Sequence, residues 1–367
     1  IGVRPEVVKM APLVKLCEAL GIDHYILHTG QHYSEDLDKK LFDDLNLRTP
    51  EYILGVGSAT QGKQTASIIS ATEQILLTDT PDLLLVYGDS NSTMGAAVAA
   101  SKLSIPVGHV EAGLRSNDKT MPEEINRIIT DHVSDYLFAP TEGDRQQLLK
   151  EGISNHKIFV TGNTVVDSIY YIKKLASTKS KILKQYGLKK NSYLLLTLHR
   201  PHNVDNKDRL RSILTGLDEL HAIYNMPIVF PIHPRTGNNI DKFNIQLPKG
   251  VIPTTPLGYI DFVYAQSNAR LVLTDSGSVQ EETCILKVPC ITIRDNTERP
   301  DTITVGSNIL CKTDSKSILN AFNVQMKKSR DWENPYGDGH AAEKIIDSII
   351  STDDPNIRSI KSIKTTR

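Results

Sequence analysis

Short runs of β-branched and other apolar residues alternate with stretches in which apolar residues recur at helical spacing. In the first half, the apolar runs fall at residues 24–28, 83–87, 107–110, 136–139 and 158–160. In the second half, they fall at residues 193–198, 227–232, 271–274, 290–293 and 308–311. Strands separated by helices are typical of parallel sheets with helices on both faces. The sequence therefore predicts an α/β protein with two doubly wound, Rossmann-like domains.

The length of 367 residues is sufficient for two domains of ordinary size. Residues 179–191 are polar and rich in lysine, and we place the domain junction between residues 163 and 190. The predicted N-terminal domain covers residues 1–165, the C-terminal domain covers 166–350, and a polar tail covers 351–367. No apolar run precedes the glycine turn at Gly2, so we expect the first strand of the N-terminal domain to be missing from this sequence.

Charge and cysteine content argue against several classes of protein. The chain has 42 basic and 43 acidic residues, a net charge of −1, and thus no basic excess for nucleic acid or an anionic membrane. Its four cysteines are too few and too scattered for a disulfide framework or a zinc site. The longest apolar runs have about five to seven residues, far fewer than the roughly twenty that span a bilayer. We expect a soluble, cytoplasmic protein that binds no nucleic acid, membrane or metal.

Ionisable residues follow many of the apolar runs. Doubly wound domains bind ligands beyond the carboxyl ends of their strands. A single polar residue there is usually a helix cap or a solvated loop residue, and Asp275 or Ser276 can cap the helix that follows. The recurrence at strand ends of both halves nevertheless predicts a ligand-binding crevice between the domains. The residues concerned are Asp89, Glu111, Arg115, His199, Arg200, His233, Arg235, Asp275, Arg294 and Asp295.

Two segments are candidates for binding an anion. Residues 274–282 indicate a strand, a tight turn and a helix, so backbone N–H groups at Ser276, Gly277 and Ser278 can hold a phosphate. Glu282, about one turn into that helix, either faces a ribose diol or is an exposed helical carboxylate. In the second segment, Arg4 and Lys9 bracket the start of a helix, and the alternative is a solvated basic pair.

Two nucleotide-binding motifs are incomplete. The stretch Gly57-Ser58-Ala59-Thr60-Gln61-Gly62-Lys63-Gln64 has Gln64 where a Walker A loop needs Ser or Thr for magnesium, and no convincing strand precedes it. Gly55-Val56-Gly57 is followed by Thr60 where a dinucleotide fingerprint has its third glycine. The sequence therefore favours neither an NTPase nor a nicotinamide-dependent enzyme.

Carboxylates and one histidine suit proton transfer at a sugar carbon. Asp89, Glu111, Glu123 and Glu124 supply the carboxylates, and His199 supplies a group that titrates near neutrality. Clustered carboxylates raise one another's pKa, which can separate an acid from a base. Glu123 also fits the first turn of a helix that begins at Pro122, and the two interpretations are compatible.

Taken together, these stretches resemble the non-hydrolysing UDP-N-acetylglucosamine 2-epimerases. The matching stretches cover nearly the whole chain in order. They are Gly2-Val3-Arg4-Pro5-Glu6, Gly88-Asp89, residues 109–115, residues 122–127, residues 162–167, Leu198-His199-Arg200, residues 274–277 with 280–282, residues 294–300 and residues 334–339.

The resemblance implies two Rossmann-like domains with an interdomain cleft (the GT-B architecture), a homodimer, no metal and no nicotinamide cofactor. It also implies a UDP-sugar substrate, a role in polysaccharide biosynthesis, and reversible conversion of UDP-GlcNAc to UDP-ManNAc. In that reaction UDP is eliminated to leave 2-acetamidoglucal and is then added back. Carried over by motif, the implied catalytic residues are Asp89, Glu111, Glu123 and His199; the implied substrate-binding residues are Arg4, Lys9, Arg200, His233, Ser276, Gly277, Ser278, Glu282 and Arg299.

Some members of the family bind UDP-GlcNAc at a second, regulatory site, whose Gln-His pair corresponds to Gln31 and His32; the alternative for His32 is a loop residue. The chain departs from the family pattern at Val3, at Ser278, where a second glycine is usual, and at His202, where Glu is usual. The alternatives are a GT-B glycosyltransferase, a hydrolysing or 2,3-diacetamido-sugar 2-epimerase, and a UDP-sugar-binding regulator.

Overall fold

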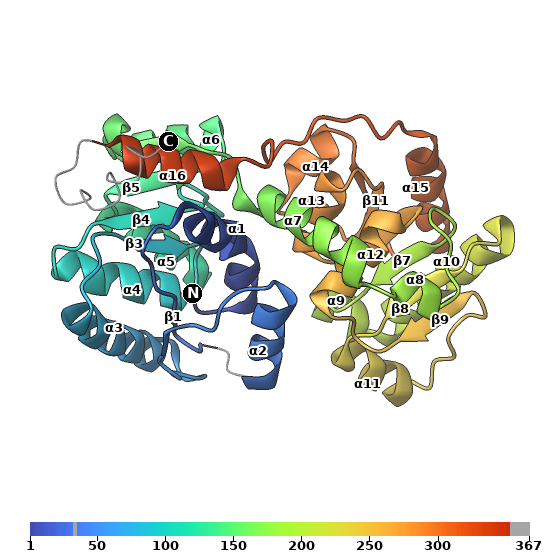
Figure 1. Cartoon of the computed structure of the whole chain (residues 1–367). Helices are drawn as coiled ribbons and strands as arrows, with labels where there is room; N and C mark the ends of the chain where they lie inside the picture. Colours follow the sequence, from blue (N-terminus) through green and yellow to red (C-terminus); the bar gives the residue numbers. More distant parts are fainter. Residues whose placement is uncertain (32–34, 353–367) are drawn as a thin grey trace. The chain divides into compact units, whose positions relative to one another are not determined.

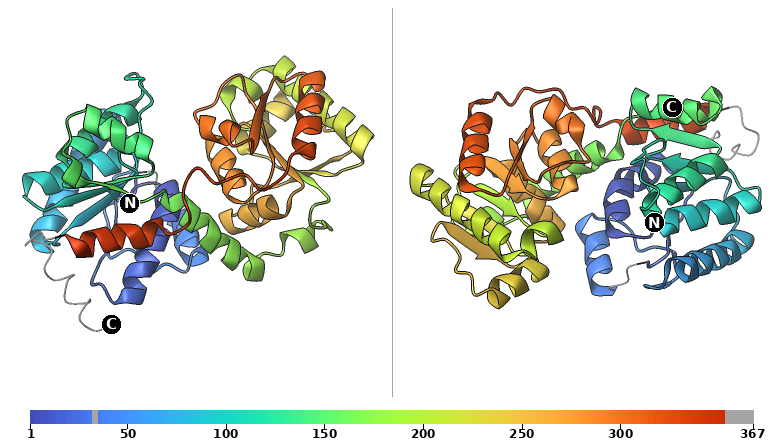
Figure 2. Two further views of the ribbon diagram at one scale, coloured as in Figure 1. Left: turned by 90° about the horizontal axis from the view of Figure 1, so that it is seen from above. Right: turned by 180° about the vertical axis from the view of Figure 1, so that it is seen from behind.

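The computed structural model describes residues 1–31 and 35–352, which form two compact units (Figure 1). Unit 1 contains Ile1–Tyr170 and the segment from Tyr336 onward, and unit 2 contains Tyr171–Pro335. The prediction of an α/β chain with two Rossmann-like units is confirmed, because each unit has a parallel sheet with helices on both faces (Figure 2). Most of the predicted polar tail, residues 353–367, lies outside the described residues.

Unit 1 is built on a four-stranded parallel sheet in the order β3-β4-β5-β6, next to a two-stranded sheet of β1 and β2. The strands are β1 (Leu27–His28), β2 (Tyr52–Ile53), β3 (Leu84–Tyr87), β4 (Val107–Val110), β5 (Tyr136–Ala139) and β6 (Ile158–Val160). The helices are α1 (Arg4–Leu20), α2 (Glu35–Asp44), α3 (Gln61–Thr78), α4 (Asn91–Lys102), α5 (Pro122–Val133), α6 (Glu142–Lys150), the short 3₁₀ helix η1 (Asn155–Lys157) and α16 (Ala341–Ser351). Helix α7 (Thr164–Lys179) begins in unit 1 and ends in unit 2.

Unit 2 contains a six-stranded parallel sheet in the order β12-β11-β10-β7-β8-β9. Its strands are β7 (Leu194–Thr197), β8 (Ile228–Pro231), β9 (Val251–Thr254), β10 (Leu271–Thr274), β11 (Cys290–Ile293) and β12 (Asn308–Cys311). Its helices are α8 (Ile182–Gln185), α9 (Pro201–Val204), α10 (Lys207–Tyr224), α11 (Pro234–Lys242), α12 (Tyr259–Asn268), α13 (Gly277–Ile285), α14 (Pro300–Thr304) and α15 (Ser315–Lys327). Leu194, Phe230, Leu273 and Phe322 are fully buried in its core, as expected for a sheet covered on both faces.

The observed units differ from the predicted ranges at the C-terminal helix. The predicted C-terminal domain includes residues 336–350, but these residues belong to unit 1, where α16 packs against α1. Ile345, Ile346 and Ile349 on α16 are buried in one apolar cluster with Met10 and Leu13 of α1. Helical spacing of apolar residues predicts a buried face, but it does not say which unit covers that face.

The first predicted strand, residues 24–28, is shortened to Leu27–His28. The backbone N–H of Ile26 donates to the carboxylate of Glu51 at 2.7 Å, so a side chain takes its hydrogen bond. Ile1 lies beside β1, where its nitrogen donates to the carbonyl of Leu27 at 3.0 Å and its carbonyl accepts from Thr29 at 2.9 Å.

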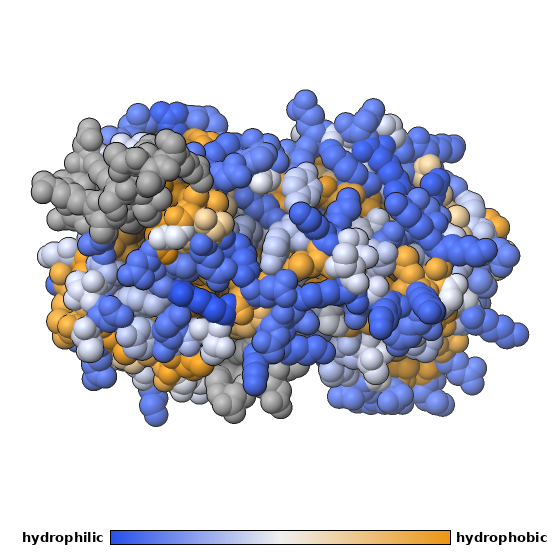
Figure 3. All heavy atoms as spheres, in the orientation of Figure 1, coloured by the Kyte–Doolittle hydropathy of each residue, from blue (hydrophilic) through white to orange (hydrophobic). Residues whose placement is uncertain are grey.

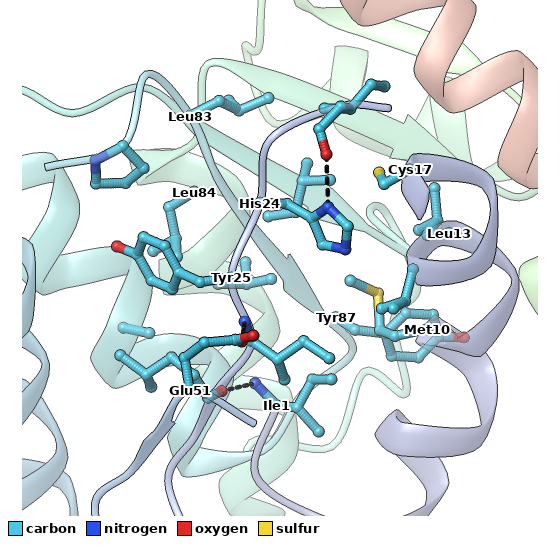
Figure 4. Close-up of a pocket in the computed structure, with 18 of the residues that line it drawn as sticks. Ile1, Met10, Leu13, Cys17, His24, Tyr25, Glu51, Leu83, Leu84 and Tyr87 are labelled. Carbon is cyan, nitrogen blue, oxygen red and sulfur yellow. Dashed lines mark hydrogen bonds between the residues drawn. The ribbon is translucent and has the colours of Figure 1, made fainter. Parts of the chain in front are cut away.

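A cavity of about 690 Å³ lies in unit 1 and is lined by residues of α1, of the segment 22–29 and of β3 (Figure 4). Its walls include Met10 and Leu13 from α1, Tyr25, and Leu84 at the start of β3. The cavity adjoins both the two-stranded and the four-stranded sheet, because Leu27 of β1 and Leu84 of β3 line it. The first strand expected before Gly2 stays a prediction. None of the described site residues predicted from the sequence lines this cavity.

Hydrophilic side chains cover most of the face shown in Figure 3, and hydrophobic residues appear between them in small groups. Within the described residues, no helix combines the length and the apolar character that crossing a membrane requires.

Candidate active site

The parallel register of β3 and β4 brings two predicted carboxylates together at one edge of the unit 1 sheet. Tyr87 is paired with Val110, so Asp89 and Glu111 follow strands that end side by side. Gly88 has φ of +71°, a left-handed conformation that glycine adopts without strain. Glu111 has φ of +73°, which is uncommon for a non-glycine residue and is typical of functional sites.

The carboxylate of Glu111 is held by three donors. It accepts from Lys9 Nζ of α1 at 3.1 Å and from Asn163 Nδ2 at 3.1 Å, and the Tyr87 hydroxyl also donates to it. Burial alone raises the pKa of Glu111, but the charge of Lys9 and the three hydrogen bonds together outweigh burial. The pKa of Glu111 is therefore lowered, and this carboxylate is ionised at neutral pH.

Asp89 has a different environment. Its carboxylate pairs with Arg127 of α5, and its backbone carbonyl accepts from Asn126 Nδ2 at 2.9 Å. Burial raises the pKa of Asp89, and the Arg127 charge opposes this effect while the charges of Glu111 and Glu123 add to it. The net shift is upward, so the pKa values of the two neighbouring carboxyl groups are displaced in opposite directions.

The two acids in the first turn of α5 have separate roles. Glu123 is exposed, and its charge acts on Asp89. Glu124 is buried and accepts from the backbone N–H groups of Ser116 and Asn117 at 2.8 and 2.9 Å, which holds the loop before the helix. Glu124 Oε2 also lies 3.2 Å from Nη1 of Arg127, the residue that pairs with Asp89, so both acids act on the surroundings of Asp89.

Sequence reasoning did not single out Asn163 and Arg127, which contact Glu111 and Asp89. Asn163 lies in residues 162–167 and Arg127 in residues 122–127, two of the stretches that resemble the family. Their place in these stretches could have identified them as candidate site residues. Their partners lie far away in the sequence and follow only from the fold.

The remaining predicted residues of unit 1 lie near the starts of α1 and α4. Arg4 is exposed at the first residue of α1. Gln31 is buried, and its Oε1 accepts from the backbone N–H and the hydroxyl of Ser92 at 3.1 and 2.8 Å. A Cβ atom at Gly2 would lie 1.9 Å from Ser92 Oγ, so Gly2 permits this close approach. His32 lies outside the described residues.

In unit 2, the register of β7 and β10 places His199 beside Asp275. Thr197 is paired with Thr274, and His199 and Asp275 follow these two residues by two positions and one position. Asp275 is fully buried; its Oδ1 lies 3.0 Å from His199 Nδ1, and its carboxylate accepts from the backbone N–H groups of His199 and Arg200. The carboxylate thus fixes the orientation of an imidazole that is 38% exposed.

The predicted phosphate turn has the expected local structure. Ser276 directly precedes α13, Gly277 is its first residue, and Ser278 is exposed. A Cβ atom at Gly277 would lie 3.6 Å from Glu298 Oε2 and 3.9 Å from Arg200 Nη2, so Arg200 lies near the turn. Arg294 binds Glu298 through two hydrogen bonds of 2.8 and 2.7 Å, which lower the pKa of Glu298 to about 2.

Glu282 is buried, so the alternative of an exposed helical carboxylate is wrong. It accepts from the Tyr259 hydroxyl at 2.9 Å and from Gln266 Nε2 at 2.6 Å. Burial, and then the charge of Glu282, raise the pKa of Tyr259, which keeps the hydroxyl a donor.

Arg299 and His233 are the remaining predicted site residues of unit 2. Arg299 Nε pairs with the buried Glu281 at 2.6 Å. His233 is exposed, caps α11, and has its ring centre 6.0 Å from that of His199. No group of three His, Cys, Asp or Glu side chains suited to a metal ion occurs within residues 1–31 and 35–352.

Comparison with known proteins adds an independent finding. Residues 15–350 match the family model described as UDP-N-acetylglucosamine 2-epimerase. A UDP-N-acetylglucosamine 2-epimerase of Methanocaldococcus jannaschii is 48% identical over 94% of this chain and 96% of its own length. A crystal structure of the M. jannaschii UDP-GlcNAc 2-epimerase in complex with UDP-GlcNAc and UDP has a TM-score of 0.80 at 48% identity, over 94% of this chain and 97% of that one.

A Pseudomonas aeruginosa UDP-2,3-diacetamido-2,3-dideoxy-D-glucuronate 2-epimerase is 38% identical over 94% of this chain and 96% of its own length. All these matches extend across both units, and the family model covers Asp89, Glu111, His199 and the Ser276 turn. The chain belongs to the UDP-N-acetylglucosamine 2-epimerase family.

Proposed function

We propose that this protein interconverts UDP-GlcNAc and UDP-ManNAc by inverting carbon 2 of the sugar. The observation that carries the proposal is the pair of adjacent carboxyl groups, Asp89 and Glu111, whose pKa values are shifted in opposite directions. Opposite shifts of this kind suit one group to donate a proton and the other to accept one. The 48% identity to an enzyme named for the same reaction supports this choice of substrate.

The chemistry must overcome the low acidity of the hydrogen on carbon 2. When the bond between carbon 1 and the UDP oxygen breaks, the electron pair leaves with UDP and positive charge develops on the ring. A carboxylate then removes the carbon 2 proton, and the electrons of that C–H bond form the double bond of 2-acetamidoglucal. UDP adds back at carbon 1 while a proton is delivered to the opposite face of carbon 2, which yields the epimer.

Unit 1 is proposed to carry out the proton transfers. Glu111 is ionised and held by three donors, so it fits the role of base at carbon 2. Asp89 has the raised pKa and fits the role of the acid, and Glu123 adds negative charge beside it. Because the reaction is reversible, the two roles exchange in the return direction.

Unit 2 is proposed to bind UDP. The N–H groups at the start of α13 and the guanidinium groups of Arg200 and Arg299 suit the diphosphate, and Glu282 suits the ribose. His199 assists departure of the phosphate, with its ring oriented by Asp275. Arg4 at the start of α1 supplies a further positive charge for the leaving group.

Proton NMR of UDP-GlcNAc in deuterated buffer tests the proposal, with the protein added and no acceptor sugar. The expected result is UDP-ManNAc with deuterium at carbon 2. Free ManNAc with UDP would indicate a hydrolysing enzyme. No change in the sugar would contradict the proposal, and would favour a glycosyltransferase or a UDP-sugar-binding protein.

A second candidate substrate is a UDP-2,3-diacetamido sugar acid, favoured by the 38% identity to the P. aeruginosa enzyme. The same carbon 2 chemistry applies to both sugars. Parallel assays with the two substrates separate the candidates, because the preferred one has the higher kcat/KM.

The homodimer and the cytoplasmic location are also proposals, and they rest on the family resemblance alone. Light scattering coupled to size-exclusion chromatography tests the first, since a dimer has twice the 40.7 kDa mass of the chain. Cell fractionation tests the second.

A further inference from the structure

A completely buried histidine lies behind the two carboxylates of unit 1. His109 is the third residue of β4, two positions before Glu111, and its ring is 0% exposed. Its Nδ1 lies 2.6 Å from Asp131 Oδ1 on α5, and its Nε2 lies 2.8 Å from the carbonyl oxygen of Gly88. Neither the proposed proton transfers nor the UDP contacts use this side chain.

The two contacts determine how many protons the ring carries. A carbonyl oxygen is an acceptor only, so Nε2 must hold a proton to bond Gly88. A neutral imidazole has a single N–H, so Nδ1 would then face the Asp131 oxygen without a proton unless the carboxyl supplies one. A proton therefore lies between Nδ1 and Oδ1 in addition to the one on Nε2.

The surroundings of Asp131 decide which partner holds that second proton. Its other oxygen, Oδ2, lies 2.7 Å from Arg115 Nη2 and 3.2 Å from the N–H of Gly113. The Arg115 side chain is 4% exposed and also forms an ion pair with Glu151. Basic and acidic side chains therefore alternate along the series His109, Asp131, Arg115 and Glu151. Both donors on Oδ2 favour an ionised Asp131, which places the proton on the imidazole.

The pair also connects the two turns that carry the site. Gly88 is the residue before Asp89; its N–H donates to Val110 at 3.1 Å, and its carbonyl faces His109. Hydrogen bonds to two residues of β4 therefore fix the position of Gly88 and of the peptide group that joins it to Asp89. On the other side, Asp131 accepts the N–H of Gly113, two residues after Glu111.

We propose that His109 is a doubly protonated imidazolium, paired with Asp131, that acts as a positioning residue for Asp89 and Glu111. The protonation state stands on the geometry alone, whereas the effect on catalysis rests on the proposed function. His109 touches no reacting atom in this proposal, because it acts through the Gly88 peptide and through Asp131.

Neutron diffraction from deuterium-exchanged crystals of the unchanged protein tests the protonation state. Deuterium on both Nδ1 and Nε2 is the expected result at neutral pH. Deuterium on a single ring nitrogen, with or without one on Asp131, would overturn the proposal. This measurement needs no variant and no activity.

The positioning role is tested with His109→Gln, which removes the double donor, and with His156→Gln as control, because His156 is an exposed histidine in η1. The His109 variant is expected to lose kcat by about 10- to 100-fold, since small displacements of catalytic groups have effects of this size. KM for UDP-GlcNAc and the stoichiometry of UDP binding by calorimetry should stay unchanged. The control should match the unchanged enzyme in every measurement.

A role limited to stability would lower the fraction of protein that binds UDP and leave kcat per UDP-binding site unchanged, and that result would overturn the positioning role. If His109→Gln does not fold, the exchanged crystals still decide the protonation state. Absence of epimerisation by the unchanged enzyme would contradict the proposed function and with it the catalytic part of this inference, but not the neutron result.

Discussion

Each unit contains a histidine beside a fully buried aspartate, and the two pairs differ in what else the ring contacts. His109 in unit 1 is completely buried and has an acceptor at each ring nitrogen. His199 in unit 2 is 38% exposed, and its Nε2 makes no hydrogen bond to any residue that the structure describes. The same two residue types thus form a closed pair in one unit and an open pair in the other.

The difference lies in the strand positions of the two histidines. His109 lies within β4, where every residue is buried, whereas His199 comes two residues after the end of β7. An imidazole with an accessible nitrogen can exchange a proton with a ligand, and a closed one can only hold its neighbours in place. A short distance between histidine and aspartate is therefore not by itself a sign of catalysis.

The largest expected effect comes from the open pair. His199→Asn should lower kcat by roughly 10²- to 10⁴-fold, because the group proposed to assist phosphate departure is lost. The thermal unfolding midpoint should change little, since the ring is partly exposed. The NMR assay and calorimetry measure the two quantities. If the variant keeps the kcat of the unchanged enzyme, the proposed catalytic role of His199 is contradicted, and the two histidine–aspartate pairs do not differ in function.

Loss of charge from the closed pair should mainly affect stability. Asp131→Asn removes the carboxylate paired with buried His109 and one of the two carboxylates paired with Arg115, so we expect a loss of about 3–5 kcal/mol in the free energy of unfolding. Asp275→Asn, the matched change in unit 2, should lose roughly 1–3 kcal/mol, because its partners include neutral N–H groups. Denaturant unfolding measures both, and equal losses would break the comparison.

A third test extends the comparison to a lysine that holds a carboxylate. Lys9→Met removes the charge that keeps the pKa of Glu111 low, so that pKa should rise. Glu111 must be ionised to act as a base, and the acid limb of kcat/KM against pH should therefore move to higher pH. Ionised Glu111 stabilises the folded state, and this stabilisation is lost as pH falls through the folded pKa of Glu111. In Lys9→Met it should be lost at a higher pH than in the unchanged protein.

Lys15→Met is the control on the same helix, because Lys15 forms an exposed ion pair with Glu18. Its pH profile should overlay that of the unchanged enzyme. If both lysine variants shift the profile equally, the shift reflects the net charge of the protein and not the contact with Glu111.

The smallest effect is expected for an exposed ion pair. Arg235 on α11 binds Asp205, and both side chains are more than two-fifths exposed. Arg235→Ala should leave the unfolding midpoint and kcat unchanged, since solvent screens such pairs. A clear loss of kcat would instead indicate that the start of α11, next to His233, contacts the substrate.

Much of the fold was predictable from local pattern. The five apolar runs predicted for unit 2 contain five of its six strands, because a parallel sheet buried on both faces needs continuous apolar segments. The remaining strand, β9 (Val251–Thr254), was not predicted, and Pro253 interrupts its apolar pattern. The shortening of the first strand was not predictable, since it depends on the Glu51 carboxylate reaching the N–H of Ile26. The unit to which α16 belongs depends on contacts between the two ends of the described chain.

The candidate site shows the same division. Asp89, Glu111 and His199 were identifiable because each lies within two residues of the end of a strand, where doubly wound folds bind ligands. The residues that contact them were not identifiable, because Lys9 and Glu111 are 102 positions apart and meet only when helix α1 packs in the folded unit. The same holds for the burial of Glu282 under Tyr259 and Gln266.

The return of α16 to unit 1 has a consequence for the order in which the protein matures on the ribosome. Met10 and Leu13 of α1 are made early, but the isoleucines that cover them are made only after all of unit 2. Unit 2 is continuous in sequence and can form its core as it leaves the ribosome. In unit 1, the apolar face of α1 stays uncovered until α16 has been synthesised. A helix synthesised before unit 2 is therefore fully packed only after unit 2 has been made.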